Sequence, residues 1–575
     1  MVNLKIDDKK VKVPEGTTVM EAAASMGIRI PSLCYLKEIN EIAACRICLV
    51  ELVGKDKLIT SCNNVVQEGM EIYTNSPKVR SARRTNIQLL LSQHDSRCAI
   101  CERSGNCNLQ QISNDMGIVS NPFPDDWNVE PWPADFPLVR HSQKCIRCMR
   151  CVQVCDKVQG VGVWDIANTG GRTTIGVSGI RKIEQSDCVL CGQCVTHCPV
   201  AALHAREDWQ QVIDAMADQE KITVVQIAPA VRTAWAEGLG IPREKATVGR
   251  LVAALRRLGF DYVFDTTFSA DLTIMEEGSE FLARFDEIRE SGKTMFTSCC
   301  PGWVRFVKSQ YPDMVEQLST AKSPQQMFGT IAKTYYAKLL NVDPKKIYCV
   351  SIMPCVAKKH EAAIPVMNDG GAGPDVDCVL TTRELARMIR ADRIMVEALE
   401  SEEFDLPLGV GTGAGVIFGS TGGVMEAALR SAYYLISGKN PAPDSFRIIR
   451  EPDGWREGEF NMAGTKVKVA VVSGLANTRK LIEALRHGEV RYDFVEVMAC
   501  PGGCVGGGGQ PIHDGEELAE LRSQYLYELD QESPIRFSHE NPAITQLYQD
   551  FLVKPMSHKA HELLHTDHEA WQMGR

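Results

Sequence analysis

Phe494-Val-Glu-Val-Met-Ala-Cys-Pro-Gly-Gly-Cys504 is a short, mostly apolar run that leads directly into two cysteines. Two other apolar runs end in the same way: Met295-Phe296 leads into Cys299-Cys300-Pro301, and Ile347–Ile352 leads into Met353-Pro-Cys355. From about residue 209 onward, strand-like and helix-like runs alternate, which predicts an α/β domain. In open α/β sheets, ligands bind at the carboxyl ends of the strands. The cysteines that follow these strands are therefore expected near one cleft: Cys300, Cys355, Cys500 and Cys504.

The chain of 575 residues has an ordinary globular composition, with 44% hydrophobic residues, 24% charged residues and a formal net charge of −10. The negative charge argues against nucleic-acid binding. The first ten residues lack the apolar region of a Sec signal peptide, and the longest uncharged run, Leu406–Met425, is too rich in glycine for a membrane span. We therefore expect a cytoplasmic protein. Its 22 cysteines then favour metal ligation over disulfides.

Residues 1–78 predict a small ferredoxin-like domain. Val2–Ile6 and Lys10–Val13 alternate like the strands of a hairpin, and a capped helix is expected over Val19–Met26. Zinc is one possible occupant of the thiols that follow, although zinc sites usually contain two Cys-x-x-Cys pairs and this segment contains one. A [2Fe–2S] cluster, which takes two ligands per iron, suits the set better. The thiols are Cys34, Cys45, Cys48 and Cys62.

Residues 79–137 carry a second ligand set and end in a Pro- and Trp-rich linker over residues 122–137. One imidazole and three thiolates can hold a [4Fe–4S] cluster, in which the histidine would tune the reduction potential. A Cys3His zinc site is the alternative. The expected ligands are His94, Cys98, Cys101 and Cys107.

Residues 138–208 contain the Cys-x2-Cys-x2-Cys-x3-Cys run of bacterial two-cluster ferredoxins twice. In such runs the fourth cysteine ligates the other cluster, so the last cysteine of each run is assigned to the opposite set. One set is Cys145, Cys148, Cys151 and Cys198, and the other is Cys188, Cys191, Cys194 and Cys155. The N-terminal half is thus predicted to carry four clusters that move single electrons to a buried site.

Three motifs in the C-terminal half carry a family resemblance: Thr297-Ser-Cys-Cys-Pro-Gly-Trp303, Met353-Pro-Cys-x-x-Lys-x-x-Glu361 and Glu496-x-Met-x-Cys-x-Gly-Gly-Cys-x-x-Gly-Gly-Gly509. The glycines of the third motif let the backbone approach a large inorganic group, and the run lacks the Gly-Lys-Ser/Thr ending of a phosphate loop. With the order of the N-terminal modules, the chain resembles the [FeFe]-hydrogenases of the clostridial ferredoxin-linked type over essentially its whole length.

The resemblance implies an H-cluster, in which a [4Fe–4S] cubane shares one thiolate with a two-iron unit that carries CO, cyanide and azadithiolate. By the same resemblance, Cys300, Cys355, Cys500 and Cys504 hold the cubane, and Cys504 is the shared ligand. Lys358 matches a lysine whose charge offsets that of a cyanide ligand. The residues that match those lining the two-iron unit are Pro229, Ala230, Met353, Phe418 and Met498.

The resemblance also implies a proton path that begins at Cys299, the cysteine left outside the ligand set. The expected order is Cys299, Glu280, Ser319 and Glu277, with the surface reached near Arg284. Glu277 and Glu280 are three residues apart and share a helix face. Without the resemblance, that face would be interpreted as solvated.

The implied activity is the reversible conversion of two protons and two electrons into H2, with electrons exchanged with ferredoxin, which would dock near the [2Fe–2S] or the His-ligated cluster. Maturation proteins would install the two-iron unit. The alternative is the catalytic subunit of an NAD- and ferredoxin-linked electron-bifurcating complex with diaphorase-type subunits. The three motifs argue against a non-catalytic electron-transfer subunit, and the intact proton path argues against an iron–sulfur assembly or sensory protein.

The predicted fold is multidomain. A β-grasp [2Fe–2S] domain, a small His/Cys3 cluster domain and a two-cluster ferredoxin domain precede a large α/β catalytic domain over residues 209–575, in which parallel sheets flank the cleft. Cys349 and Cys378 are expected to be small buried side chains and not ligands. The tail histidines are expected on a solvated helix face and not at a metal site: His558, His561, His565 and His568.

Overall fold

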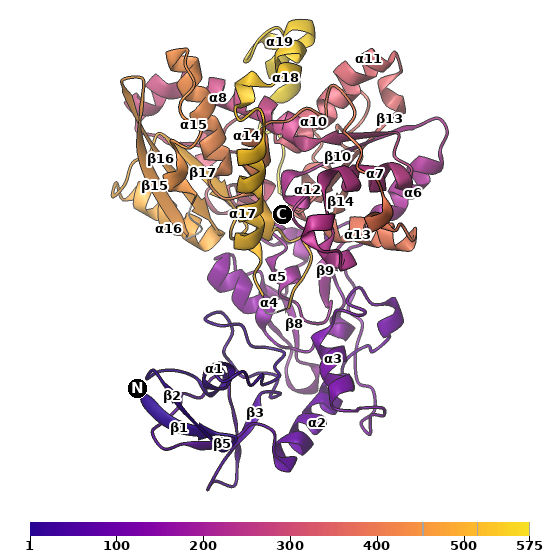
Figure 1. Cartoon of the computed structure of the whole chain (residues 1–575), viewed down its shortest axis with the longest axis vertical. Helices are drawn as coiled ribbons and strands as arrows, with labels where there is room; N and C mark the ends of the chain where they lie inside the picture. Colours follow the sequence, from indigo (N-terminus) through magenta and orange to yellow (C-terminus); the bar gives the residue numbers. More distant parts are fainter. Residues whose placement is uncertain (451–453, 515, 574–575) are drawn as a thin grey trace. The chain divides into compact units, whose positions relative to one another are not determined.

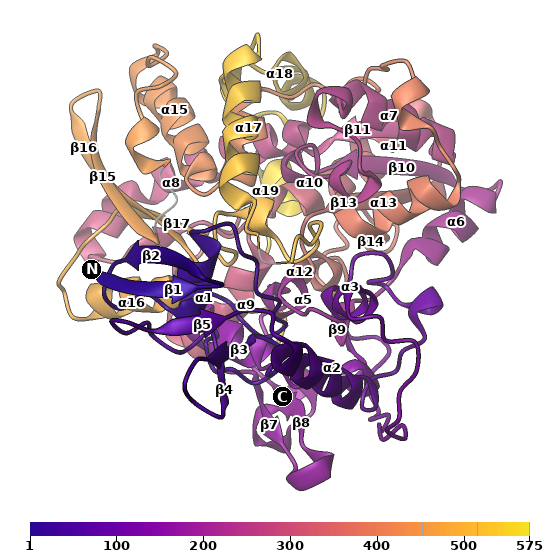
Figure 2. The ribbon, with the colours of Figure 1, turned by 60° about the horizontal axis from the view of Figure 1, so that its bottom comes forward.

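The computed structural model describes residues 1–450, 454–514 and 516–573, and it divides into two compact units (Figures 1 and 2). The first unit comprises Met1–Val158, Gly162–Ser186 and His197–His204. The second comprises Gln159–Val161, Asp187–Thr196 and Ala205–Arg575. Two short segments of the predicted two-cluster ferredoxin domain therefore pack with the catalytic half. The domain boundaries predicted from the sequence stay predictions.

The N-terminal part of the first unit is a β-grasp fold, as predicted. Its sheet has the order β2-β1-β5-β3-β4, in which β1 (Val2–Ile6) pairs antiparallel with β2 (Lys9–Val13) and parallel with β5 (Glu71–Tyr73). Helix α1 (Val19–Ala24) starts at a capping box and ends two residues earlier than predicted, because the chain turns before Gly27, whose φ is +75°.

Apart from helix α2, the other strands and α-helices of this part of the chain are short, which suits loops that carry cluster ligands. They are β3 (Leu49–Leu52), β4 (Leu58–Thr60), α2 (Pro77–Leu91), α3 (Asn108–Asp115), β6 (Leu138–Arg140), α4 (Arg150–Gln153), β7 (Trp164–Ala167), β8 (Thr174–Val177) and β9 (Leu203–Ala205).

The second unit contains two sheets built mainly from parallel strands. The first sheet has the order β11-β10-β13-β14, with all neighbours parallel. The second has the order β12-β17-β16-β15, in which only the β15–β16 hairpin is antiparallel. The strands are β10 (Ile222–Ile227), β11 (Tyr262–Asp265), β12 (Met295–Phe296), β13 (Ile347–Met353), β14 (Cys378–Thr381), β15 (Trp455–Met462), β16 (Thr465–Ser473) and β17 (Phe494–Met498).

Helix α8 (Thr266–Ser291) contributes to the cores of both sheets. Phe268 and Leu272 belong to the core around the first sheet, whereas Ile274 and Phe281 belong to the core around the second. A helix that buries apolar residues on two sides has little exposed surface near its centre. The carboxylates on its central turns are therefore buried, whereas a solvated face was the expectation without the family resemblance.

The remaining α-helices of the second unit surround and separate the sheets, and both views show α17 between them (Figures 1 and 2). They are α5 (Gln193–Thr196), α6 (Trp209–Ala217), α7 (Val248–Leu258), α9 (Pro301–Gln310), α10 (Pro324–Ile331), α11 (Ala337–Leu340), α12 (Ala357–Glu361), α13 (Thr382–Ala391), α14 (Gly413–Val416), α15 (Gly423–Ser437), α16 (Leu475–Arg486), α17 (Ala519–Glu532), α18 (Pro542–Leu547) and α19 (His558–Leu564).

Among the described residues, no helix is long and apolar enough to cross a membrane. The cytoplasmic location stays a prediction from the sequence.

Candidate functional site

One cavity of the second unit brings together all the residues that the sequence predicted at the H-cluster. Its walls come from the ends of β13 and β17, the start of α9, and the short helical turns at Pro229–Val231 and Ile417–Gly419. Pro229 begins the first of these turns. The predicted residues in the walls are Cys299, Cys300, Cys355, Cys500, Cys504, Lys358, Pro229, Ala230, Met353, Phe418 and Met498.

The thiols of this cavity suit an iron–sulfur cluster chemically. Burial raises the pKa of Cys300 and Cys504, raises that of Cys355 to about 12, and raises that of Cys500 well above its usual range. Four thiolates gathered in one dry cavity would repel each other, so they need positive charge between them. Iron supplies that charge and binds thiolate sulfur strongly. The donors present therefore fit the cubane of an H-cluster.

Glycines close the cavity by backbone contact. A Cβ atom at Gly507 would lie 2.2 Å from the carbonyl oxygen of Pro354, and one at Gly508 would lie 2.5 Å from the carbonyl oxygen of Cys191. Because a side chain at either position would collide with backbone, glycine is required here. The same close packing brings the Cys500 sulfur within 3.7 Å of the Cys191 carbonyl oxygen. A predicted accessory-cluster ligand thus lies directly beside a predicted cubane ligand.

Lys358 is held at the cavity by Glu361, one helical turn away. The Lys358 ammonium donates to Glu361 Oε2 at 2.9 Å and to the Cys299 carbonyl oxygen at 3.1 Å. Burial alone would lower the pKa of Lys358, but the Glu361 carboxylate more than offsets it, so the pKa lies above its ordinary value. A permanent positive charge therefore faces the space predicted for the two-iron unit.

Sequence reasoning did not assign roles to three polar residues around the cavity. Gln325 lines the cavity and donates to Glu361, and its buried side-chain oxygen has no hydrogen-bond partner among the described residues. Glu361 was quoted in the second motif but given no role. Glu496, from the third motif, accepts from the Gly422 and Met425 N–H groups at 2.7 Å each, and burial raises its pKa to about 7. For Glu361 and Glu496 the position in a motif was the available signal, whereas Gln325 lies outside the motifs.

The residues of the predicted proton path lie close together, but their contacts support an order in which the two glutamates are exchanged. Burial and the charge of Glu277 raise the pKa of Cys299 well above its usual range. Glu277 is therefore the glutamate that interacts with Cys299 electrostatically. Glu280 instead pairs with Arg284 at 3.0 Å and accepts from the Ser319 hydroxyl at 2.7 Å. The order that fits is Cys299, Glu277, Ser319, Glu280 and Arg284, because Arg284 is partly exposed and Glu277 is not.

Glu277 should be neutral in the folded protein at neutral pH. It is 1% exposed, and burial, with the charge of Glu280, raises its pKa from 4.5 to about 8. Among the described residues, neither carboxyl oxygen has a hydrogen-bond partner within normal distance, although the Ser319 hydroxyl and the Ser298 N–H are close enough to oppose part of the rise. A carboxyl group poised in this way can both give and take a proton.

We expect Glu277→Gln to stabilise the protein at high pH only. The folded state keeps the Glu277 proton to a higher pH than the unfolded state, so wild-type stability falls as pH rises from 4.5 to about 8. The glutamine amide cannot ionise, so the variant does not lose this stability. The difference in the free energy of unfolding is on the order of a few kcal/mol. The melting temperatures of the variant and the wild type should therefore coincide near pH 4.5, and that of the variant should be the higher one at pH 8. Glu287→Gln, at an exposed position of the same helix, is the control; parallel melting profiles for Glu277→Gln and wild type would contradict the assignment.

Two tail histidines contradict the expectation of a solvated helix face. His558 and His561 are exposed, but His565 is 4% and His568 is 9% exposed. Helix α19 ends at Leu564, and an isolated bridge then pairs His565 with Ala321 and carries the chain inward. His568 Nε2 lies 2.9 Å from the Ser319 carbonyl oxygen. Helical periodicity could not show this, because the segment after Leu564 is not helical.

In the first unit, the thiols predicted to hold the [2Fe–2S] cluster lie against each other and are buried. Contact with Cys34 lowers the pKa of Cys45 to about 6, and contact with Cys62 lowers that of Cys48 to about 7, while the partner thiols shift upward. Thiols that share protons in this way are adjacent, as ligands of one cluster must be.

The first unit also orients its predicted imidazole ligand. His94 is buried, and its Nδ1 lies 2.9 Å from the Lys144 carbonyl oxygen. A carbonyl can only accept, so Nδ1 carries the proton and Nε2 keeps its lone pair for a metal. Burial lowers the pKa of His94, which favours this neutral form. The other predicted ligands of this set, Cys98, Cys101 and Cys107, are partly exposed.

A further cavity of the first unit supports the predicted exchange of the fourth ferredoxin cysteine. Cys198 lines it together with the first three cysteines of the earlier run, and its remaining walls are largely apolar. The predicted ligands around it are Cys145, Cys148, Cys151 and Cys198. Cys188, Cys191 and Cys194 belong to the second unit and Cys155 to the first, so their shared cluster stays a prediction.

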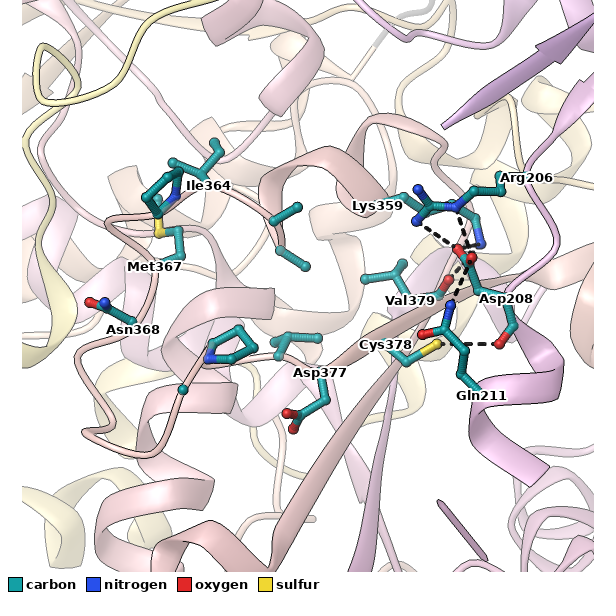
Figure 3. A pocket seen from close by; sticks show the side chains of 16 residues that line it. Arg206, Asp208, Gln211, Lys359, Ile364, Met367, Asn368, Asp377, Cys378 and Val379 are labelled. Atoms are coloured by element: carbon teal, nitrogen blue, oxygen red, sulfur yellow. Dashed lines mark hydrogen bonds and ion pairs between the residues drawn. The ribbon is translucent and has the colours of Figure 1, made fainter. Parts of the chain in front are cut away.

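Cys349 and Cys378 lie away from the cluster cavity, as expected, and both are buried. Cys378 lines a separate cavity of about 480 Å³, where its sulfur lies 3.7 Å from the Asp208 carbonyl oxygen (Figure 3). Lys359, in the same wall, is paired with Asp208 and Glu384. All 22 cysteines lie in the described part of the chain, and none forms a disulfide there.

Together, the fold and the cavities define an iron–sulfur oxidoreductase with a buried catalytic cluster. A family profile described as "Iron only hydrogenase large subunit, C-terminal domain" matches residues 221–508, and one described as "Iron hydrogenase small subunit" matches residues 516–571. The chain belongs to the iron-only, or [FeFe], hydrogenase family. It is thus an enzyme of H2 metabolism that carries accessory iron–sulfur clusters in addition to the H-cluster.

Profiles for the N-terminal half identify its cluster domains. A "2Fe-2S iron-sulfur cluster binding domain" matches residues 1–77, an "NADH-ubiquinone oxidoreductase-G iron-sulfur binding region" matches residues 83–122, and a "4Fe-4S dicluster domain" matches residues 144–202. These matches favour iron–sulfur clusters over the zinc alternatives.

Known proteins resemble the chain over most of its length. It is 46% identical to the NADP-reducing hydrogenase subunit HndD of Solidesulfovibrio fructosivorans, over 98% of each chain. It is 40% identical to iron hydrogenase 1 of Clostridium pasteurianum, over 98% of this chain and 99% of that one. A solved structure of an apo [FeFe]-hydrogenase HydA1 variant from Chlamydomonas reinhardtii is 43% identical, with a TM-score of 0.57, over 64% of this chain and 99% of that one.

The rival class of iron–sulfur assembly proteins is also related, but less closely. Cytosolic iron-sulfur assembly component 3 of Mus musculus is 30% identical over 74% of this chain and 93% of that protein.

Proposed function

We propose that Cys300, Cys355, Cys500 and Cys504 hold the cubane, and that Cys504 is shared with the two-iron unit. The supporting observation is that one cavity gathers these four thiols from the ends of separate strands. When bound, the two-iron unit supplies the metal site at which H2 is split or formed. Apolar walls exclude water from this site, so protons can reach it only through protein groups. The residues of these walls are Pro229, Ala230, Met353, Phe418 and Met498.

In the proposed mechanism, Cys299 is the first protein group to exchange a proton with the cavity. Its proton passes to Glu277, then through the Ser319 hydroxyl to Glu280, and leaves beside Arg284. The steps are supported by the influence of Glu277 on Cys299 and by the 2.7 Å contact between Ser319 and Glu280. The raised pKa of Glu277, about 8, suits a group that must be protonated and deprotonated in each cycle.

Lys358 is proposed to hold the anionic two-iron unit in place. Its ammonium donates to Glu361 and to the Cys299 carbonyl oxygen, so its orientation is fixed before the unit arrives. A buried cation facing a group with cyanide ligands contributes charge-assisted hydrogen bonds.

We further propose ferredoxin as the electron partner and the four N-terminal clusters as the route between ferredoxin and the cavity. Support comes from the N-terminal cluster domains and from the contact between the Cys500 sulfur and Cys191. The similarity to a subunit of an NADP-reducing hydrogenase favours a second candidate, in which partner subunits deliver electrons from a nicotinamide nucleotide.

An assay of the purified chain separates these two partners. If ferredoxin is the direct partner, reduced ferredoxin should support H2 formation by this chain alone, and NADPH should not. H2 formation from NADPH without any added subunit would contradict both proposed electron partners. Inactivity with reduced ferredoxin would favour the candidate in which partner subunits deliver the electrons.

Infrared spectroscopy tests the proposed site. After co-expression with maturation proteins for the two-iron unit, bands from iron-bound CO and cyanide should be present. Their absence in a protein that holds its accessory clusters would refute the assignment of this cavity.

A further inference from the structure

A chain of buried hydrogen bonds continues from Glu280 into the C-terminal tail. Glu280 Oε1 accepts from the Thr320 N–H at 3.1 Å and from the Thr320 hydroxyl at 3.2 Å. The same hydroxyl oxygen lies 2.8 Å from Nδ1 of His565. On the far side of the ring, Nε2 of His565 lies 3.2 Å from Oε2 of Glu276. One hydroxyl therefore connects the last glutamate of the proposed proton path to a buried histidine.

The backbone fixes His565 at this position. Residues 564–566 run beside residues 320–322, where Thr566 N–H donates to the Thr320 carbonyl oxygen and Lys322 N–H donates to the Leu564 carbonyl oxygen, each at 2.8 Å. These two bonds hold Thr320 and His565 in register. The contact between their side chains is therefore part of the fold and not a chance surface encounter.

Glu276 is positioned to hold the imidazole. It is fully buried, and it accepts from the Tyr548 hydroxyl at 2.5 Å and from the Met556 N–H at 2.9 Å. These two donors fix the orientation of the carboxyl group. A carboxylate beside Nε2 keeps the proton on that nitrogen and stabilises the imidazolium when Nδ1 gains a second proton. The pair has the form of a proton acceptor backed by an orienting carboxylate.

We propose that Thr320, His565 and Glu276 form a second proton branch that leaves the path at Glu280. In the direction of H2 oxidation, the Glu280 proton moves to the Thr320 oxygen while the hydroxyl proton moves to Nδ1 of His565. The products are the Glu280 carboxylate and a His565 imidazolium paired with Glu276. Three groups change hydrogen-bond roles, one proton is transferred overall, and no electron changes hands. The proposal rests on the proton path proposed above.

The branch has a route to solvent that is separate from Arg284. The exposed His561 ring stacks on His565, with ring centroids 4.9 Å apart and planes 5° apart. Because His561 is exposed, solvent reaches this pair of rings directly. The titratable groups that face His565 or Glu280 here are Glu276, Glu280, Arg284, Tyr548, His561 and His568.

The first test is His565→Ala with chemical rescue. We expect H2 oxidation with an artificial electron acceptor to fall about threefold to tenfold, because the Arg284 branch remains while a positioned base is lost. Added imidazole should restore the rate, and pyrazole, which has the same ring shape but is a much weaker base, should not. Equal rescue by the two rings would show that His565 only fills space and would overturn the proposal. His558→Ala, at an exposed position of the preceding helix α19, is the matched control.

The second test removes the connecting hydroxyl and does not depend on the folding of the alanine variant. Thr320→Val should show the same fall in rate as His565→Ala, whereas Thr320→Ser should retain wild-type turnover. Equal turnover of the valine and serine variants would overturn the branch. Cys299→Ala distinguishes failure of the proton path from failure of the branch. If the Cys299→Ala variant is active, the proposed proton path is wrong. If it is inactive while Thr320→Val has normal turnover, only the branch is wrong.

Discussion

Cys299→Ala should abolish H2 turnover while leaving the metal content of the protein unchanged. The cavity contains one thiol beyond the four proposed ligands, and Glu277 is the titratable group that most affects it. Lys358, the other protonatable group in the walls, is committed to Glu361 and to the Cys299 carbonyl oxygen. Without Cys299, no protein group is left to pass protons between cavity and path. Loss of a positioned proton donor lowers turnover by at least about 10²-fold.

The measurement combines H2 turnover in both directions with iron analysis and infrared spectra. Iron content and the CO and cyanide bands should match those of the wild type. Cys349→Ala is the control, because this cysteine is buried but lies in strand β13, outside the cavity walls. Near-normal turnover of Cys299→Ala, or loss of iron together with activity, would contradict its role as a free thiol that carries protons.

Gly507→Ala should remove the catalytic cubane. The backbone at Gly507 has φ −64° and ψ 151°, which any residue can adopt, so the change adds no conformational strain. Its effect is steric, because the new methyl group would lie 2.2 Å from the carbonyl oxygen of Pro354 and 2.8 Å from that of Cys504. Both contacts are with backbone next to proposed ligands. The overlap can be relieved only if the segment of Cys504 moves away from that of Cys355. We expect this movement to lower the free energy of unfolding by about 3 kcal/mol.

Iron analysis and electron paramagnetic resonance can follow this change. We expect the variant to lose the iron of the catalytic site and all turnover, and to keep the signals of the accessory clusters. Gly171→Ala is the control, since a Cβ atom at Gly171 would meet no heavy atom within 4 Å. A Gly507→Ala variant with full iron content and activity would show that the cavity can open to admit a side chain.

Much of this site could be predicted from the sequence because the chemistry depends on short, local signals. Met353-Pro-Cys355 and Met498-Ala-Cys500 each follow a run of apolar residues that can only be a buried strand, and parallel strands place their ends at one edge. Cys299 and Cys300 follow β12, which has only two residues, so the motif and not the strand pattern was the informative feature there.

The order of the proton path could not be obtained in the same way. Glu277 and Glu280 share a helix face at a spacing of three residues, and this spacing is the same whichever of them is nearer to Cys299. The order depends on the direction in which α8 runs past the cavity and on Arg284, one turn further along. His565 was misjudged for a related reason: its burial depends on pairing with residue 321, which is far away in sequence.

The meeting of Gly192 with Gly508 has a consequence for electron transfer. Their backbones pack without any intervening side chain, and the Gln193 amide fastens the same segment to the Gly506 carbonyl oxygen at 2.8 Å. In the proposed electron route, the last hop before the cubane would therefore span a tunnelling distance that is set by the packing of the main chain.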